Sequence, residues 1–177
     1  MKYLHSFFNW EAIGQNGTYL SREIPKNEIL KQVMLPITPG CYVWIYDNKV
    51  IYIGRSNNIQ NRLGAHIFSK ISGPRSNAIF ATTARDTVIR FYSKVDIEIY
   101  RNLSKEEKSS NQDYLILLNK LNEILNKSSF KIYSTKDYSD SFNLERELIK
   151  DLKPITNNVI PNTTRKRDDF KVLGIKI

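Results

Sequence analysis

The 177-residue sequence contains very few of the residues that form disulfide frameworks or structural metal sites. It has one cysteine, Cys41, and two histidines. A single cysteine cannot form a disulfide within the chain, and so few thiols and imidazoles make a structural zinc site implausible. These absences fit a reducing compartment, and we expect a cytoplasmic protein.

Long apolar runs and linkers are also missing. Near the N-terminus His5, Asn9 and Glu11 interrupt the apolar residues, and no run elsewhere approaches the length of a membrane span. The sequence shows no repeat, no low-complexity block and no Gly/Ser-rich or Pro-rich linker. With 41% hydrophobic residues it is long enough for one domain with a proper core. We therefore expect a soluble protein folded as a single domain over residues 1–177.

Positive charge predominates in the composition. The 27 Lys and Arg residues outnumber the 18 Asp and Glu residues, which gives a net charge of +9. This excess suits a polyanionic partner such as nucleic acid better than an acidic membrane, because no basic amphipathic helix stands out. A basic surface that serves only solubility is the alternative, and charge alone does not separate the two.

Residues 41–53 have the pattern of a β-hairpin. Two runs rich in β-branched and aromatic residues flank the polar residues 47–49. A two-residue loop would send Tyr42 and Tyr52 to opposite faces. A three-residue loop, or a bulge of equal parity, would place Tyr52 opposite Trp44 with Tyr42 on the same face. We predict the second arrangement.

A helix is predicted directly after the hairpin, with Ser56 as its N-cap. Its apolar residues are spaced four apart: Ile59, Leu63 and Ile67. Arg62 and His66 have the same spacing, so both side chains are expected to project from one side of this helix.

The remaining elements are predicted from periodicity and capping signals. Residues 22–35 resemble a short helix beginning near Pro25, and 95–100 and 130–134 have strand character. Ser104 and Glu107 form a capping box that opens a helix running to about Lys127. The apolar face of that helix is expected to be core, with a dimer contact as the alternative: Tyr114, Leu117, Leu118, Leu121, Ile124 and Leu125.

The last predicted helix carries a carboxylate beside its apolar stripe. It is expected to be capped by Asp140 or Ser141 and to end before Pro154. Its buried face would be formed by Leu144, Leu148 and Leu152. Glu145 lies next to this stripe, where an ionised carboxylate is costly unless it pairs with a cation or faces a cleft.

Several motifs together resemble the GIY-YIG nuclease family. They are Gly40-Cys41-Tyr42, Tyr52-Ile53-Gly54, an arginine ten residues after the second tyrosine, and Leu-Glu-x-x-Leu-Ile-(x)3-Lys-Pro-x-x-Asn at 144–157. Each motif alone is a weak signal, because such short patterns also occur by chance, but all of them occur here in the family order. The resemblance covers residues 38–70 and 130–158.

This resemblance implies an α/β (α+β) fold with a small antiparallel three-stranded central sheet flanked by helices. The sequence departs from the family pattern in two ways. Cys41 replaces the isoleucine of the family name, at a buried strand position where a small apolar side chain should serve. The distance of 83 residues from Arg62 to Glu145 exceeds what a minimal member needs. We therefore interpret residues 1–37 as an N-terminal arm and about 74–128 as a large helical and strand insertion.

The family also implies hydrolysis of DNA phosphodiester bonds with Mg²⁺, or Mn²⁺, as cofactor. Glu145 would be the metal ligand, since hydrated Mg²⁺ demands few protein ligands. Arg62 would stabilise charge on the phosphate in the transition state. Tyr42 would activate the attacking water with Tyr52 as its partner, although a phenol becomes a base at neutral pH only if nearby cations lower its pKa. The sequence does not settle which tyrosine is the base.

Other residues are assigned more peripheral roles by the same resemblance. His66 resembles a histidine that contacts phosphate or assists the base in some members, and Asn157 resembles a late asparagine that braces the site. Arg55 and Asn58 are predicted to contact DNA. Without the resemblance, the tyrosines would be ordinary core aromatics, the charged residues solvated helix positions and His66 a structural histidine.

A basic cluster near the C-terminus has two interpretations. Residues 163–171 include Arg165, Lys166 and Arg167, which we assign to the DNA backbone. A solvated tail is the alternative.

Three functions compete at this stage. The first is a sequence-specific endonuclease of the type II restriction class, which would cut double-stranded DNA and, for palindromic sites, would favour a homodimer. The second is a repair or mobile-element nuclease of low sequence specificity. The third is a catalytically inactive DNA-binding module, which the intact set of motif residues argues against.

Overall fold

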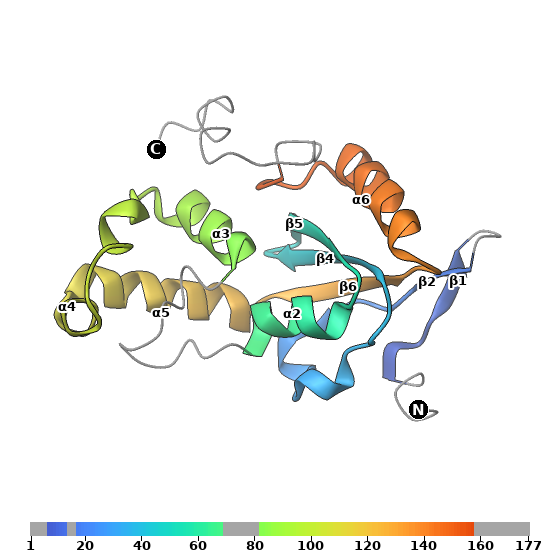
Figure 1. Cartoon of the computed structure of the whole chain (residues 1–177), viewed down its shortest axis with the longest axis horizontal. Coiled ribbons are helices and arrows are strands. Elements are labelled where there is room, and N and C mark those ends of the chain that lie inside the picture. The colour runs from blue at the N-terminus through green and yellow to red at the C-terminus, as the bar shows by residue number, and fades with distance from the viewer. Residues whose placement is uncertain (1–6, 14–16, 69–81, 158–177) are drawn as a thin grey trace.

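The computed structural model describes residues 7–13, 17–68 and 82–157, whose arrangement is shown in Figure 1. Three antiparallel strands form its centre, in the order β6-β4-β5. Their bounds are Gly40–Tyr46 for β4, Lys49–Ser56 for β5 and Ser129–Ser134 for β6. Helices pack on both faces of this sheet. The predicted α+β fold, with an antiparallel sheet flanked by helices, is therefore confirmed.

The N-terminal arm extends the sheet beyond the three predicted strands. It contributes β1 (Glu11–Ile13), β2 (Thr18–Leu20) and β3 (Ile24–Pro25), and both β2 and β3 pair antiparallel with β6. Without the arm, β6 would be an edge strand with a row of unsatisfied main-chain groups. The arm thus completes the sheet on the side away from β5.

The helix predicted over residues 22–35 is wrong. The chain forms β3 and then two 3₁₀ turns, Lys26–Glu28 and Gln32–Met34. Ile24 pairs with Phe130 of β6, so the start of the segment is part of the sheet. Leu30 and Val33 are exposed, which means that the segment has no continuous apolar stripe to bury as a helix.

The β4–β5 hairpin has the predicted parity but a different turn. Asp47 and Asn48 form a two-residue loop, and both have positive φ (53° and 55°), as a type I′ turn requires. The three-residue loop is therefore wrong. A register shift after Trp44 restores the predicted pairing, because Trp44 lies opposite Tyr52. The bulge alternative is confirmed.

The two faces of the sheet are covered by different helices. One face packs in a large core against α2 (Ile59–Phe68), α3 (Thr83–Ser93) and α5 (Gln112–Asn126). The opposite face packs in a smaller cluster against α6 (Tyr138–Leu152). None of the helices described within residues 7–13, 17–68 and 82–157 has the length and apolarity to cross a membrane.

The strand predicted over residues 95–100 is also wrong. α3, which was not predicted, ends at Ser93, and its C-cap, Lys94, lies in the left-handed region (φ 58°). A 3₁₀ turn follows at Ile97–Tyr100. In this turn Ile97 and Tyr100 are buried while Ile99 is exposed. Burial of residues three apart fits a 3₁₀ turn, whereas a strand would bury alternate residues.

The helix predicted from Ser104 to Lys127 is divided in two. The capping box of Ser104 and Glu107 is present at the start of α4 (Lys105–Ser110). Asn111 then interrupts the helix, and its side chain caps α5. All six apolar residues of the predicted core face are buried: Tyr114, Leu117, Leu118, Leu121, Ile124 and Leu125.

Two predicted N-caps are wrong by a few residues. α6 begins at Tyr138 with Asp137 as its cap, because the Asp137 side chain accepts from the Asp140 N–H. α2 is capped by Asn58, whose Oδ1 accepts from the Asn61 N–H at 3.0 Å. The apolar stripe of α2 is buried as predicted: Ile59, Leu63 and Ile67. In α6 Leu148 is buried, but Leu152, in the last turn of the helix, is 42% exposed.

Candidate active site

The two tyrosines of the motif triplets lie together on the face covered by α2 and α3. Their ring centroids are 6.3 Å apart, and both side chains are buried. Gly54 lies directly opposite Tyr42 in the sheet, and a Cβ there would come within 2.4 Å of Tyr42 Oη. The glycine of the second triplet is therefore required for close approach of the Tyr42 hydroxyl, and any larger residue would displace it.

His66 holds the hydroxyl of Tyr42. Tyr42 Oη and His66 Nε2 lie 2.5 Å apart, and the opposite ring nitrogen, Nδ1, lies 2.8 Å from Thr82 Oγ1. The imidazole is buried against the rings of Tyr42, Trp44 and Tyr52. Burial, followed by the nearby charges of Arg85 and Arg62, lowers the pKa of His66 to about 3. The imidazole is therefore neutral at physiological pH.

Tyr42 keeps its proton in this environment. Burial is the main cause that raises its pKa well above the ordinary value, and the neighbouring Tyr52 adds to it. The charge of Arg62 acts in the opposite direction, and that of Glu145 raises the pKa further. Nearby cations do not outweigh burial here, so Tyr42 is a neutral phenol rather than a phenolate base.

Arg62 and His66 do not share one environment, although they lie one helical turn apart. His66 points into the core, whereas Arg62 is exposed at the surface of α2. The positive charge of Arg62 still lowers the pKa values of both His66 and Tyr42. Arg62 therefore presents a guanidinium to solvent next to the tyrosine site.

Glu145 lies on the opposite face of the hairpin, where α6 packs. It is only 5% exposed, and its Oε2 accepts from Arg55 Nε at 2.8 Å. The Arg55 guanidinium lies over the rings of Tyr138 and Phe142, at 4.9 and 4.7 Å from their centroids. The cost of burying the carboxylate is therefore offset by a cation that two aromatic rings hold in place.

Cys41 explains how α6 comes close enough to place Glu145. Its thiol donates to the main-chain carbonyl of Ser141 at 3.0 Å, one turn before Glu145 in α6. Leu148 and Ile149 pack with Cys41 in the same cluster. The substitution in the family motif thus fills a tight contact between strand and helix with a small side chain that can also donate a hydrogen bond.

Asn157 braces β5 between the two halves of the site. Its Oδ1 accepts from the Ile53 N–H at 2.6 Å, and its Nδ2 donates to the Ile53 carbonyl at 2.5 Å. The preceding residues, Ile155 and Thr156, donate main-chain hydrogen bonds to Val50 and Ile51. The segment after α6 therefore covers the outer edge of the hairpin.

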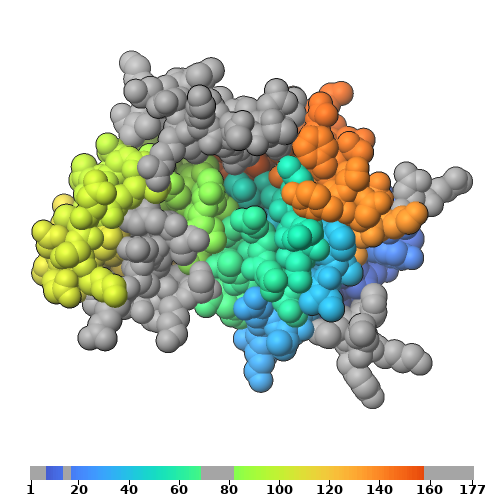
Figure 2. Space-filling model, viewed as in Figure 1, coloured from blue at the N-terminus to red at the C-terminus, as the bar shows by residue number. Residues whose placement is uncertain are grey.

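The other predicted DNA contacts have separate placements. Asn58 uses its side chain to cap α2, and Arg55 uses its Nε to bind Glu145. Arg165, Lys166 and Arg167 lie outside the described residues, as does the neighbouring Asn158. α2, which carries Arg62, and α6, which carries Glu145, both reach the face of the molecule shown in Figure 2.

The sequence did not predict two residues that contact His66. They are Thr82 and Arg85. They lie in the segment interpreted as an insertion, where Thr82 caps α3 and Arg85 lies in its first turn, and this helix was itself not predicted. Thr82 followed by Asp86 in the first turn is a helix-start signal that could have revealed α3. No local pattern indicates that its first turn contacts His66.

A match to a known family agrees with the interpretation of the motifs. The family described as "GIY-YIG catalytic domain" matches residues 38–158. Among solved structures, the chain is similar to the crystal structure of the GIY-YIG N-terminal endonuclease domain of UvrC from Thermotoga maritima bound to its catalytic divalent cation, magnesium. The identity is 17%, the match covers 75% of this chain and 94% of that chain, and the TM-score is 0.38. No curated protein matches the sequence. Because the family match spans more than half of the sequence and includes both tyrosine triplets, this chain belongs to the GIY-YIG family of nucleases.

Proposed function

We propose that this protein is a magnesium-dependent endonuclease that hydrolyses phosphodiester bonds of double-stranded DNA. One observation carries the proposal. A neutral Tyr42–His66 pair and the buried Glu145 carboxylate lie on the two faces of one hairpin, close enough for the charge of Glu145 to raise the pKa of Tyr42. A hydroxyl that orients water and a carboxylate that binds metal suit hydrolysis of a bound phosphodiester.

Glu145 is the residue that would hold the divalent cation. Mg²⁺ commonly binds one or two carboxylates and completes its shell with waters and substrate phosphate oxygens. Within residues 7–13, 17–68 and 82–157, no group of three or more His, Cys, Asp and Glu residues could hold a metal by itself. A site built on one carboxylate fits Mg²⁺, or Mn²⁺, better than a metal caged by protein ligands. When bound, the cation would neutralise phosphate charge and stabilise the leaving 3′ oxygen.

Tyr42 would orient the attacking water. Its only proton is best used as a donor to His66 Nε2, because His66 is its hydrogen-bond partner among the described residues. A lone pair of Tyr42 Oη then accepts from the water, so the water oxygen is aimed at phosphorus. A neutral phenol cannot remove the proton outright, and a phosphate oxygen would accept it.

The remaining site residues act through charge and position. Arg62 is exposed beside the tyrosines and would donate to the non-bridging phosphate oxygens as charge develops in the transition state. Arg55 holds the Glu145 carboxylate in place. Asn157 fixes the main chain of β5 at Ile53, and therefore the register of Tyr52 and Gly54 on either side.

We further propose sequence-specific cleavage of the restriction type. The support is that residues 82–128 form an ordered set of helices beside the catalytic hairpin, a surface that could read a DNA sequence. Low-specificity cleavage in repair or in a mobile element is the second candidate, and the family membership favours it equally. Cutting at palindromic sites would require two copies, and light scattering of the purified protein on DNA would detect them.

Digestion of unmethylated phage DNA with Mg²⁺ tests these proposals. Discrete fragments support restriction-type cleavage, whereas a smear of nicked products supports the low-specificity alternative. Retained DNA binding without cutting would overturn the nuclease proposal in favour of an inactive binding module. Arg62→Ala and Glu145→Ala should each abolish cleavage and leave DNA binding measurable.

The distribution of charge gives a second test. The described ranges contain 19 of the 27 basic residues and 16 of the 18 acidic residues. Most of the net charge of +9 therefore belongs to residues outside those ranges. If Arg165, Lys166 and Arg167 track the DNA backbone, their replacement by glutamine should flatten the dependence of affinity on salt by roughly 0.9 in slope per lost phosphate contact. An unchanged slope would show that the tail is only solvated.

A further inference from the structure

The first turn of α3 holds His66 at two separate points. Thr82 Oγ1 lies 2.8 Å from the ring nitrogen Nδ1. Arg85 donates from Nε to the main-chain carbonyl of His66 at 2.8 Å, and its Nη2 donates to the same oxygen. Both the ring and the backbone of His66 are therefore bound by one helical turn that lies 16 to 19 residues further along the chain.

Arg85 is buried to an unusual degree for an arginine. Its side chain is 0% exposed, and burial lowers its pKa to about 10. Burying a guanidinium is expensive unless its donors are used. The carbonyl of His66 lies in the last turn of α2, where main-chain carbonyls have no partner within the helix. Arg85 therefore caps α2 at the residue that holds Tyr42.

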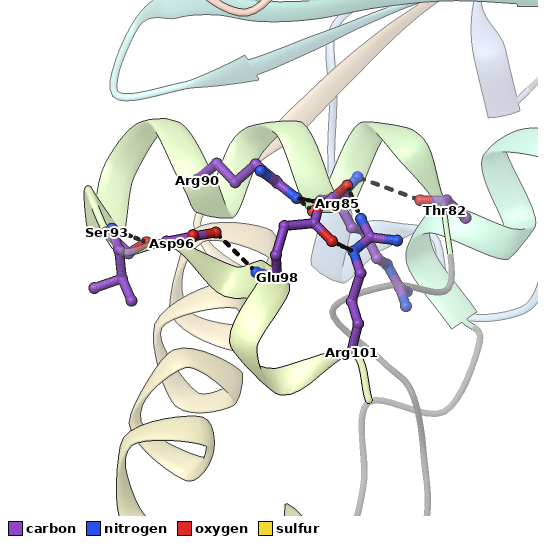
Figure 3. A network of polar contacts seen from close by, with 9 residues as sticks. Thr82, Arg85, Arg90, Ser93, Asp96, Glu98 and Arg101 are labelled. Carbon is purple, nitrogen blue, oxygen red and sulfur yellow. Dashed lines mark hydrogen bonds and ion pairs between the residues drawn. The ribbon is translucent and has the colours of Figure 1, made fainter. Parts of the chain in front are cut away.

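Thr82 contacts the ring nitrogen of His66 that faces away from Tyr42. With Tyr42 as the donor to Nε2, a neutral imidazole must carry its own proton on Nδ1. Thr82 Oγ1 can accept a hydrogen bond from Nδ1–H. Its second lone pair accepts from the main-chain N–H of Arg85 at 3.3 Å. The Thr82 to Arg85 bond fixes the hydroxyl in place, as Figure 3 shows.

α3 is itself clamped, which makes it a rigid support. Asp86, one residue after Arg85, pairs with Arg90 at 2.9 Å and with Arg101 at 2.5 Å. Arg101 also pairs with Glu98 at 2.7 Å, and Glu98 binds Arg90. These pairs join α3 to the 3₁₀ turn that follows it (Figure 3). The four charges form a closed network, and so the first turn of α3 has little freedom to move away from His66.

We infer that Thr82 and Arg85 are positioning residues of the catalytic site, which hold the ring and backbone of His66 so that Nε2 accepts from Tyr42. The segment between α2 and β6 is then part of the catalytic machinery and not only added surface. The predicted loss of rate rests on the proposed nuclease function. The predicted tautomer does not, because it follows from hydrogen bonding in the free protein.

The first experiment compares Thr82→Val with Thr82→Ser. Valine keeps the shape of the side chain but removes the acceptor, whereas serine keeps it. Imidazole ¹⁵N chemical shifts of the free protein should assign the proton of His66 to Nδ1 in the wild type and in Thr82→Ser. In Thr82→Val this pattern should be lost. An unchanged pattern in Thr82→Val, or a wild-type proton on Nε2, would overturn the inference.

The second experiment measures the rate at which the protein nicks a supercoiled plasmid with Mg²⁺. Thr82→Val should lower kcat by about 10- to 100-fold, as loss of partners that orient a functional imidazole typically does, with KM for DNA unchanged. Thr82→Ser should stay close to the wild type. Equal kcat in Thr82→Val would contradict the positioning role. A wild-type protein that does not nick DNA would instead overturn the nuclease proposal, and the tautomer would still be decided by the shifts.

A control separates positioning from lost helix capping. Asn111→Ala removes the cap of α5, which does not contact His66, and should destabilise the protein to an extent similar to Thr82→Val. Its kcat should equal that of the wild type. Arg85→Lys and Arg85→Met form a second pair, in which lysine should restore most of the kcat lost with methionine. If Arg85→Met does not fold, the Thr82 pair still decides.

Discussion

The two faces of the β4–β5 hairpin hold the two halves of the site in opposite electrostatic states. On the face covered by α2 and α3, Tyr42 and His66 are both neutral and share one short hydrogen bond. On the face covered by α6, Glu145 and Arg55 form an ion pair. Burial keeps Tyr42 and His66 neutral, whereas Glu145 stays charged beside Arg55, a cation that two aromatic rings hold in place. The two halves should therefore respond differently to substitution, metal and pH.

The largest effect is expected on the charged half. Glu145→Gln removes the carboxylate that would hold the cation, so single-turnover cleavage should fall by about 10²- to 10³-fold or more, the range for loss of a preorganised charge-stabilising group. Glu147→Gln, on the exposed side of the same helix, is the matched control. Similar rates for the two variants would place the metal site elsewhere.

A somewhat smaller effect is expected on the neutral half. Tyr42→Phe keeps the ring but removes the hydroxyl proposed to orient water, so kcat should fall about 100-fold, the lower range for a positioned proton-transfer group. Tyr46→Phe removes a hydroxyl from the same strand, where the ring of Tyr46 packs against Tyr92. That control should cleave DNA at the wild-type rate, and equal losses in both variants would indicate a general effect on the hairpin.

When Arg55 is replaced, Mg²⁺ should take its place as the cation that pairs with Glu145. Arg55→Met leaves a buried carboxylate without this cation and should lower the free energy of unfolding by about 1–3 kcal/mol. Adding Mg²⁺ should raise Tm more in this variant than in the wild type, because binding to the folded state stabilises it. The double variant with Glu145→Gln should not respond. A response there would mean that Mg²⁺ binds at another position.

The pH dependence of stability should distinguish the neutral half. The pKa of His66 is lowered from 6.5 to about 3 in the folded protein, so between these values the unfolded chain binds one proton more than the folded chain. The stabilisation is complete above pH 6.5 and is lost as the pH falls toward 3, with a slope of about 1.4 kcal/mol per pH unit. His66→Gln should lack this component in urea unfolding measured at several pH values. Parallel pH profiles would show that folding does not lower the pKa of His66.

The sequence predicted the hairpin half of this site well, for local reasons. Alternation of aromatic and β-branched residues marks the strands, and the turn together with the bulge after Trp44 decides whether Tyr42 and Tyr52 share a face. The helical stripes of α2 and α5 are equally local. The assignment of catalytic roles to Arg62, Glu145 and Asn157 remains a prediction for mutagenesis.

The parts that were missed depend on contacts distant in sequence. β1 and β2 have three residues each and β3 has two, and β2 and β3 exist because β6 offers them an edge. α3 contains Thr87, Val88 and Ile89, whose β-branched side chains favour a strand locally. Its helical form comes from capping at Thr82 and from packing against α5. The same long-range contacts place Thr82 and Arg85 on His66, which no periodicity could indicate.

A double-mutant cycle on DNA cleavage tests most directly whether the neutral half works as one unit. The kcat values of Tyr42→Phe, His66→Gln and the double variant would be measured on the same DNA with Mg²⁺. If His66 acts through the Tyr42 hydroxyl, the double variant should be no slower than Tyr42→Phe alone, because residues that act together are not additive. Losses that multiply in the double variant would show independent roles and would contradict the Tyr42–His66 pair as the group that orients water.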